Sequence, residues 1–256
     1  METILRAMGK MVPIATADVR KMNKLIRGDC LQELKKIEDC SCDISFTSPP
    51  YNRKRNDKYD NYDDSIDDYS AFLINVIDQM LRVTKRNVFF NIQKNFYNKQ
   101  DVFEIIGHYS KKICEIFIWE KSNPMPAPGH GITNAYEFVI VFGSEIRSNK
   151  TYTKNHITTS GAKMHKTHKA IMHQDVADFF ITNFTKENDT VLDPFMGSGT
   201  TGVTCKNFNR KFIGIELDPE YFQIAFKRIS NAEKQGNLFR ELPKCPEQLS
   251  MMEILT

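Results

Sequence analysis

Hydrophobic and polar positions along this chain follow two periods in alternation. Short apolar runs, typical of buried strands, occur at 25–27, 42–47, 87–92, 113–119, 136–142, 191–193 and 211–216. Between them, apolar residues at helical spacing predict helices over 31–37, 69–83, 99–110, 173–184 and 220–233. Strands that alternate with helices indicate a mostly parallel sheet, and hence the α/β class.

Composition narrows the class of protein. A chain of 256 residues with 41% hydrophobic content suits one domain, or one domain with an insertion, around a sizeable core. It has neither an apolar run long enough to span a membrane nor a signal-peptide pattern, so we expect a cytoplasmic location. The six cysteines lack the paired spacing of a zinc site, so we expect reduced thiols and no metal.

The string Ser48-Pro49-Pro50-Tyr51 directly follows the predicted strand 42–47. Two consecutive prolines cannot donate to a strand ladder, so the chain must leave the sheet there. The carbonyls of Ser48 and Pro49 are then left without strand partners at a strand's carboxyl end, where open α/β sheets bind ligands. This turn suits a flat, amine-bearing ring, although a proline-rich surface turn with a buried tyrosine is the structural alternative.

A second string, from Asp193 to Gly202, reads as strand end, glycine loop and helix start. Glycines let the backbone approach a ligand closely, and Thr200 or Thr201 is a candidate N-cap. The next strand, 211–216, ends in Glu216, whose carboxylate can accept from both hydroxyls of a ribose. The string also fits the dinucleotide pattern G-x-G-x-x-G, but too few residues follow it to complete a dehydrogenase fold.

Together the two strings resemble those of the S-adenosylmethionine-dependent amino-methyltransferases of DNA. That family has a catalytic [Ser/Asn/Asp]-Pro-Pro-[Tyr/Phe/Trp] motif and a cofactor loop Asp-Pro-Phe-x-Gly-Ser-Gly-Thr-Thr. The catalytic string comes first here, as in the circularly permuted beta group, and the resemblance covers residues 23–233. It implies a Rossmann-like class I methyltransferase fold, with helices on both faces of a seven-stranded sheet and one antiparallel hairpin, 113–119 with 136–143.

The order of the strings also disfavours a related enzyme class. The methyltransferases that act on glutamine amides of proteins place the cofactor loop before their Pro-Pro-Tyr string. A DNA-binding module with a decayed methyltransferase fold is a further alternative, against which the intact Ser48 and Glu216 argue.

The resemblance assigns site residues by position. The catalytic set is Ser48, Pro49, Pro50 and Tyr51. The cofactor set is Asp29, Cys30, Asp193, Pro194, Phe195, Gly197, Ser198, Gly199, Thr200, Glu216 and Leu217, with Asp29 accepting from the adenine amine, capping the next helix, or both. The run that begins at Trp119 resembles a loop lining the base pocket, but Trp119 itself is expected in the core.

The implied chemistry is methyl transfer to an exocyclic amine. Hydrogen bonds from the amine to Ser48 and to the Pro49 carbonyl would favour a pyramidal nitrogen, with no covalent enzyme intermediate. The base must be flipped out of the duplex, and Tyr51 can stack on it. In the family, Ser at this position is associated mainly with N4-cytosine enzymes and Asp with N6-adenine enzymes, so we predict N4 of cytosine, with N6 of adenine as the alternative.

Positive charge is concentrated in one window. Residues 146–174 contain no acid, and they include the candidate DNA contacts Arg147, Lys150, Lys154, Lys163, Lys166 and Lys169. The location, 144–172, matches the target-recognition region of the family, although a solvated loop is the structural alternative. A second polar loop, 52–68, carries Arg53, Lys54 and Arg55 and is either a flap over the base or a charge-balanced excursion; Ser65 or Asp67 is a candidate cap of the helix after it.

The predicted organisation is an extension (1–22), a catalytic domain (23–236) and an irregular tail (237–256). The expected partners are double-stranded DNA and, in a restriction–modification system, a cognate restriction endonuclease. No membrane partner is expected, and the choice between a monomer and a homodimer stays open.

Overall fold

A computed structural model describes residues 24–52, 65–124, 133–159 and 172–241, with side chains to Lys234. The predicted extension 1–22 and six of the predicted DNA contacts lie outside the described residues. Those six are Arg53, Lys54, Arg55, Lys163, Lys166 and Lys169.

One mixed sheet organises the described chain. Its strands are β1 (Lys24–Arg27), β2 (Ile44–Thr47), β3 (Val88–Ile92), β4 (Ile113–Lys121), β5 (Tyr136–Phe142), β6 (His156–Thr159), β7 (Thr190–Asp193) and β8 (Lys211–Glu216). They lie in the order β1-β8-β7-β2-β3-β5-β4-β6. Only β5 is antiparallel to its neighbours, β3 and β4, which confirms the predicted mostly parallel sheet and its single antiparallel hairpin.

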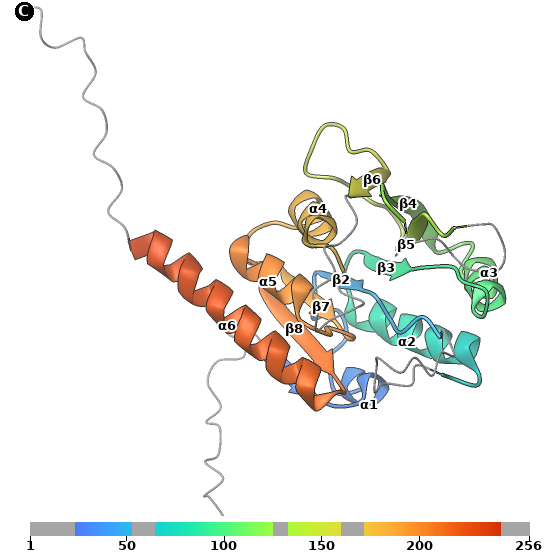
Figure 1. Ribbon diagram of the computed structural model, residues 1–256, viewed down its shortest axis with the longest axis horizontal. Helices are drawn as coiled ribbons and strands as arrows, with labels where there is room; N and C mark the ends of the chain where they lie inside the picture. The colour runs from blue at the N-terminus through green and yellow to red at the C-terminus, as the bar shows by residue number, and fades with distance from the viewer. Residues whose placement is uncertain (1–23, 53–64, 125–132, 160–171, 242–256) are drawn as a thin grey trace, which may run out of the picture.

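Helices cover both faces of this sheet (Figure 1). They are α1 (Cys30–Leu34), α2 (Tyr69–Val83), α3 (Lys99–His108), α4 (Gln174–Phe184), α5 (Thr200–Asn207) and α6 (Pro219–Glu241). On one face, Phe46 of β2 and Phe89 of β3 pack on Phe180 of α4, with ring centroids 5.2 and 5.3 Å apart. On the other face, Phe90 and the apolar side of α2 form a second buried cluster. Burial on both faces explains the nearly continuous apolar run of β3.

The sheet has eight strands, so the expected count of seven is corrected. The additional strand is β6, which extends the sheet by pairing in parallel with β4, from Ile118 with His156 to Lys121 with Thr159. It lies in the predicted recognition window. Its four residues give too short and too polar a pattern to stand out from a loop, and only pairing with β4 makes them a strand.

Several element ends also differ from the predicted ones. Helix α6 continues to Glu241, so the tail is not irregular from residue 237, and Gly236 is tolerated inside the helix. Asp68, rather than Ser65 or Asp67, caps α2, with its carboxylate accepting from the Ala71 amide at 3.2 Å. Among the described residues, no helix is long and apolar enough to cross a membrane.

The strand order reverses between β2 and β7. From β2 the chain continues to β3 on one side, and from β7 it continues to β8 on the other. Strands β2 and β7 pair in parallel, Ile44 with Val191 and Ser45 with Leu192, so their carboxyl ends lie side by side. Ligands of open α/β sheets bind at such a switch point, and the two strings singled out in the sequence both begin there.

Candidate active site

The string Ser48–Tyr51 leaves β2 beside β7, the strand that leads into the glycine loop. Thr47, the last residue of β2, donates from its hydroxyl to Asp193 of β7 at 2.7 Å. On the other side, the Tyr69 hydroxyl of α2 donates to the Pro50 carbonyl. Within the described part of the chain, the Ser48 and Pro49 carbonyls have no hydrogen-bond partner, as the double proline predicted.

The backbone after the string is held by asparagines. The Tyr51 carbonyl accepts from the side-chain amides of Asn95 and Asn98, at 2.8 and 2.9 Å. Asn52 has a left-handed φ of 49° and exchanges two hydrogen bonds with the backbone of Ile66, which joins the two sides of the 53–64 segment. These contacts fix where Tyr51 lies relative to β3.

A polar network links the string to β3, β4 and β5. Ser48 Oγ lies 2.7 Å from Tyr51 Oη, which donates to Glu137 Oε2 at 2.7 Å. The amide of Asn91 contacts all three, at 3.3 Å to Ser48 and 2.8 Å to each of the others. Lys121 Nζ pairs with Glu137 Oε1 at 2.5 Å, and Glu137 is only 4% exposed.

Sequence reasoning missed Asn91 and Glu137, and it included Lys121 only as part of the run from Trp119 to Pro124 that resembles a loop lining the base pocket. Both missed residues carried a signal: Asn91 interrupts the apolar strand run Val88–Ile92, and Glu137 interrupts Tyr136–Phe142. A polar residue buried within a strand needs a partner, so each of these positions indicated a polar site.

Asp193 lies beneath the cofactor loop. Its carboxylate is buried and accepts from the hydroxyls of Thr47 and Thr201 and from the Phe195 amide, at 2.7, 2.8 and 3.1 Å. Burial raises its pKa to about 6, against the opposing effect of these hydrogen bonds. Asp193 therefore connects the glycine loop, through Phe195 and Thr201, to Thr47 at the end of β2.

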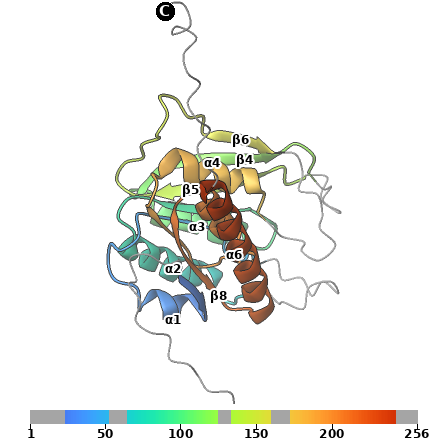
Figure 2. The same ribbon diagram turned by 90° about the vertical axis from the view of Figure 1, so that its left-hand side faces the viewer.

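The glycine loop bends through two left-handed residues, Gly197 at φ 50° and Gly199 at φ 83°. Gly199 is the N-cap of α5, so Thr200 and Thr201 are its first residues and not its caps. Arg228 of α6 donates to the Ser198 carbonyl and hydroxyl at 2.6 and 2.8 Å. In Figure 2, α6 faces the viewer and runs along this side of the sheet.

Glu216 closes the opposite side of the loop at the end of β8. Its two oxygens accept from the Gly197 and Asp218 amides at 2.9 and 2.8 Å, and burial raises its pKa. Each carboxylate oxygen retains acceptor capacity for a further donor. The neighbouring Leu217 is 54% exposed, so its apolar side chain is accessible.

The turn after β1 lies against Glu216, because the Gly28 amide donates to the Glu216 carbonyl at 3.0 Å. Asp29 caps α1 by accepting from the Gln32 amide at 2.9 Å, one of its two predicted roles. Cys30 is buried, and burial raises the pKa of its thiol to about 12, so the thiol is neutral. The five cysteines in the described residues are all free, as expected.

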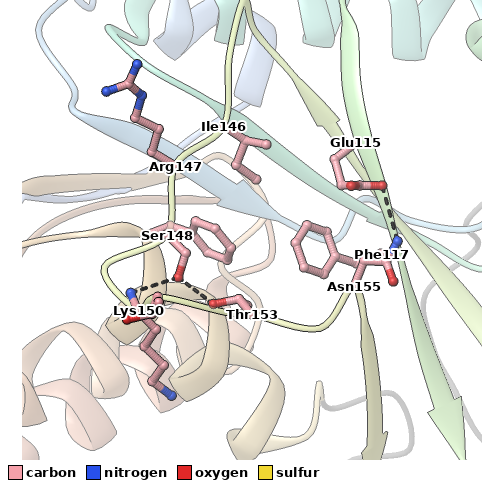
Figure 3. Close-up of a pocket in the computed structure, with 10 residues that line it drawn as sticks. Glu115, Phe117, Ile146, Arg147, Ser148, Lys150, Thr153 and Asn155 are labelled. Carbon is pink, nitrogen blue, oxygen red and sulfur yellow. Dashed lines mark hydrogen bonds between the residues drawn. The ribbon is translucent and has the colours of Figure 1, made fainter.

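We call the side of the sheet at the carboxyl ends of the parallel strands, beside Ser48, the catalytic edge, and the side at their amino ends the opposite edge. The described residues of the predicted basic window lie at both. Figure 3 shows Arg147 and Lys150 beside a cavity of about 390 Å³ that is also lined by Glu115 of β4. Glu115 lies six residues before Lys121, or about 20 Å away along an extended strand. Arg147 and Lys150 therefore lie at the edge opposite to Ser48, and Arg147 pairs with Glu145. Thr159, in contrast, pairs with Lys121 at the catalytic edge, immediately before the 160–171 segment.

Two aromatic side chains are exposed at the catalytic edge, after β3. Phe96 is 62% exposed and Tyr97 49% exposed, and the Lys99 ammonium lies 5.5 Å from the Phe96 ring. They belong to the turn that Asn95 and Asn98 attach to Tyr51. Trp119, as expected, lies in the core, where its indole N–H donates to the Thr159 hydroxyl at 2.8 Å.

Two curated proteins with similar sequences are type II methyltransferases. Type II methyltransferase M.HinfI of Haemophilus influenzae is 28% identical over 84% of this chain and 70% of its own length. Type II methyltransferase M.MwoI of Methanothermobacter wolfeii is 32% identical over 76% of this chain, which spans only 32% of that relative.

Solved structures share the fold. The PvuII DNA methyltransferase (cytosine-N4-specific) superposes with a TM-score of 0.66 at 20% identity, over 84% of this chain and 92% of that one. The M1.HpyAVI–SAM complex superposes with a TM-score of 0.57 at 25% identity, over 81% of this chain and 100% of that one. A sequence model of the N6/N4 methyltransferases, described as DNA methylase, matches residues 42–227, which include both strings. The chain therefore belongs to the N6/N4 DNA methylase family.

Proposed function

We propose that this chain methylates double-stranded DNA at the exocyclic amine of a flipped base, namely N4 of cytosine, with S-adenosylmethionine as the methyl donor. The main support for this proposal is the pair of hydrogen-bond acceptors at the switch point, the Ser48 hydroxyl and the Pro49 carbonyl. They lie at the end of β2, directly beside the strand that carries the glycine loop.

The cofactor site fits S-adenosylmethionine. Space is open beside Gly197, where an added Cβ would lie 4.0 Å from the Phe195 carbonyl oxygen, an ordinary van der Waals distance. Glu216 offers carboxylate lone pairs to the ribose hydroxyls, and Leu217 offers an exposed apolar surface to the adenine. The Thr200 hydroxyl is buried without a partner among the described residues, at the start of α5, where a helix favours a carboxylate. When bound, the cofactor supplies an electrophilic methyl group on its sulfonium.

In this proposal the protein orients the target amine and surrounds it with hydrogen-bond acceptors. The lone pair of an exocyclic amine is delocalised into the base, which makes the nitrogen a weak nucleophile. Two acceptors, Ser48 Oγ and the Pro49 carbonyl, bind the two N–H groups and favour a pyramidal nitrogen with its lone pair free. Most of the catalysis then comes from orientation and preorganised dipoles, with no covalent enzyme intermediate.

Ser48 supports cytosine as the base. In the family that the motif resembles, serine at this position accompanies mainly N4-cytosine enzymes. A serine hydroxyl is uncharged, in contrast to the aspartate associated with N6-adenine enzymes.

The DNA lies across the catalytic edge of the sheet in this proposal. Phe96, Tyr97 and Lys99 border that edge, and Thr159, the residue before the segment that contains Lys163, Lys166 and Lys169, pairs with Lys121. By the same proposal the enzyme protects a short recognition site in a restriction–modification system, where a restriction endonuclease cuts the unmodified site.

The direct test is mass spectrometry of nucleosides from double-stranded DNA incubated with the protein and S-adenosylmethionine. We expect N4-methylcytosine with the wild type and none with Ser48→Ala, whose cofactor affinity should be unchanged. N6-methyladenine would correct the base while leaving the amine chemistry in place. DNA of varied sequence without any methylated base would overturn the proposal.

A further inference from the structure

The directions of the hydrogen bonds around Ser48 follow from one buried carboxylate. Glu137 is ion-paired with Lys121 and, as a carboxylate, can only accept. The single phenolic proton of Tyr51 therefore goes to Glu137 Oε2, at 2.7 Å. Tyr51 Oη must then accept from Ser48, whose oxygen is 2.7 Å away, and the serine proton is committed to that bond.

The contacts of Asn91 are consistent with these hydrogen-bond directions. Its amide group faces Glu137 and Tyr51 at 2.8 Å, because the opposite amide orientation would set two acceptors against each other at the carboxylate. Its oxygen is buried without a partner among the described residues, the cost of this orientation. Asn91 can donate to Ser48 but takes no proton from it, at 3.3 Å.

We propose that Glu137, acting through Tyr51, holds the Ser48 hydroxyl as an acceptor for the target amine and then receives the proton that methylation releases. Glu137 is thus a positioning residue and the end of a proton relay, and Lys121 keeps its carboxylate in place. The inference rests on the proposed function, since it needs an amine at Ser48.

The relay balances in atoms and charge. When the N–CH₃ bond forms and the S–CH₃ bond breaks, the positive charge passes from the sulfonium to the amine nitrogen. The nitrogen releases one proton to Ser48 Oγ, the serine proton moves to Tyr51 Oη, and the tyrosine proton moves to Glu137 Oε2. Serine and tyrosine end neutral, the methylated amine ends neutral, and the protonated Glu137 returns its proton to water after product release.

The test is a double-mutant cycle on the single-turnover rate of methyl transfer to DNA, with Glu137→Gln, Tyr51→Phe and both together. Glutamine still accepts from Tyr51 but cannot take its proton, and phenylalanine breaks the relay while keeping the ring. We expect each single variant to be slower by about 10²-fold or more, with unchanged affinity for cofactor and DNA. Because both changes break one relay, the double variant should be no slower than the slower single variant.

Two further variants separate the relay from a structural role. Glu137→Asp keeps a carboxylate and should recover part of the rate that Glu137→Gln loses, a recovery that mere packing would not give. Glu115→Gln, a carboxylate loss at the opposite edge of the sheet, should leave the rate unchanged.

The outcomes distinguish the two proposals. Wild-type protein that never methylates DNA refutes the proposed function and the relay together. An active wild type with a full-rate Glu137→Gln variant, with losses that multiply in the double variant, or with no recovery in Glu137→Asp refutes the relay alone.

Discussion

Two buried carboxylates near the switch point, those of Glu137 and Asp193, have different surroundings. Glu137 is ion-paired with Lys121 and accepts from the Tyr51 hydroxyl. Asp193 receives only hydroxyls and one backbone amide, so burial dominates and raises its pKa to about 6. The same side-chain chemistry therefore serves two tasks, directing protons at Glu137 and tying β2 to the cofactor loop at Asp193.

The raised pKa of Asp193 makes the stability of the protein depend on pH. The folded carboxyl binds its proton more tightly than the unfolded one, so its contribution to the free energy of unfolding falls as pH rises from 3.8 to about 6. The full change is about 3 kcal/mol. Asp193→Asn lacks this titration. Urea unfolding of both proteins between pH 4 and 7 should show a difference that changes in this direction, and a difference independent of pH would contradict the prediction.

Glu216 is expected to bind the ribose of the cofactor. Glu216→Gln replaces charge-assisted hydrogen bonds by neutral ones, so the affinity for S-adenosylmethionine should fall about tenfold, or about 1.4 kcal/mol. Calorimetric titration measures this directly. Glu220→Gln, which removes an exposed carboxylate from the first turn of α6, is the matched control and should bind normally. Equal affinities in the two variants would exclude the ribose role.

At the scale of elements, α6 packs against the outer side of the glycine loop. Arg228 holds the Ser198 backbone, and a Cβ on Gly199 would lie 3.0 Å from Ala225. The conformation of the loop therefore depends on a helix that begins after the next strand.

Gly199→Ala tests this packing. Alanine is strained at φ 83° and its Cβ meets α6, so the free energy of unfolding should fall by roughly 1–3 kcal/mol. Cofactor affinity should fall as well, because the strain acts on the loop that binds it. Chemical denaturation and calorimetry provide the two readouts. Gly107→Ala, where an added Cβ meets nothing within 4 Å, is the control that should not be destabilised.

The turn between β3 and α3 presents a second testable element. Asn95 and Asn98 fix it to Tyr51, and it exposes Phe96 and Tyr97 at the catalytic edge. Aromatic rings there can stack on bases, at about 1–3 kcal/mol each. The double variant Phe96→Ala and Tyr97→Ala should weaken DNA binding by at least tenfold in a fluorescence-anisotropy titration. Tyr152→Ala removes a 91% exposed ring before β6 and should bind as the wild type does; equal losses in both would refute a specific role of the turn.

At the scale of the whole molecule, the candidate site residues gather at one end of the strands, the catalytic edge. Both motifs, the turn after β3 and the end of β6 lie there, whereas Arg147 and Lys150 lie at the other edge. The DNA contact of Arg147 and Lys150 stays a prediction, and their position disfavours it.

Salt dependence separates the two halves of the basic window. Replacing Lys163, Lys166 and Lys169 by alanine should flatten the plot of log affinity for DNA against log salt, by about 0.9 for each phosphate that is no longer neutralised. Replacing Arg147 and Lys150 should leave the slope unchanged, because they line a cavity with Glu115, which lies about 20 Å from Lys121 along β4. The reverse pattern would place the DNA across the cavity edge.

Local patterns along the sequence determined most elements of this fold and the identity of its two motifs. Helix α2 over Tyr69–Val83 and strand β8 over Lys211–Glu216 have the predicted bounds, because apolar spacing and flanking polar residues act over a few positions. The alternation of strands with helices also implied the mostly parallel sheet. Strand β6 escaped prediction because only one of its four residues, Ile157, is apolar, so its pattern does not differ from that of a polar loop.

Only the tertiary structure decided the polar network at Ser48. Tyr51 and Glu137 are 86 positions apart, and they meet because the register of β3, β4 and β5 brings Asn91, Lys121 and Glu137 to one point. A buried polar residue announces in the sequence that it needs a partner, but the pairing of distant strands chooses which one. The physical reason is that strand register depends on packing over the whole sheet, whereas motifs and helical periods are read within one segment.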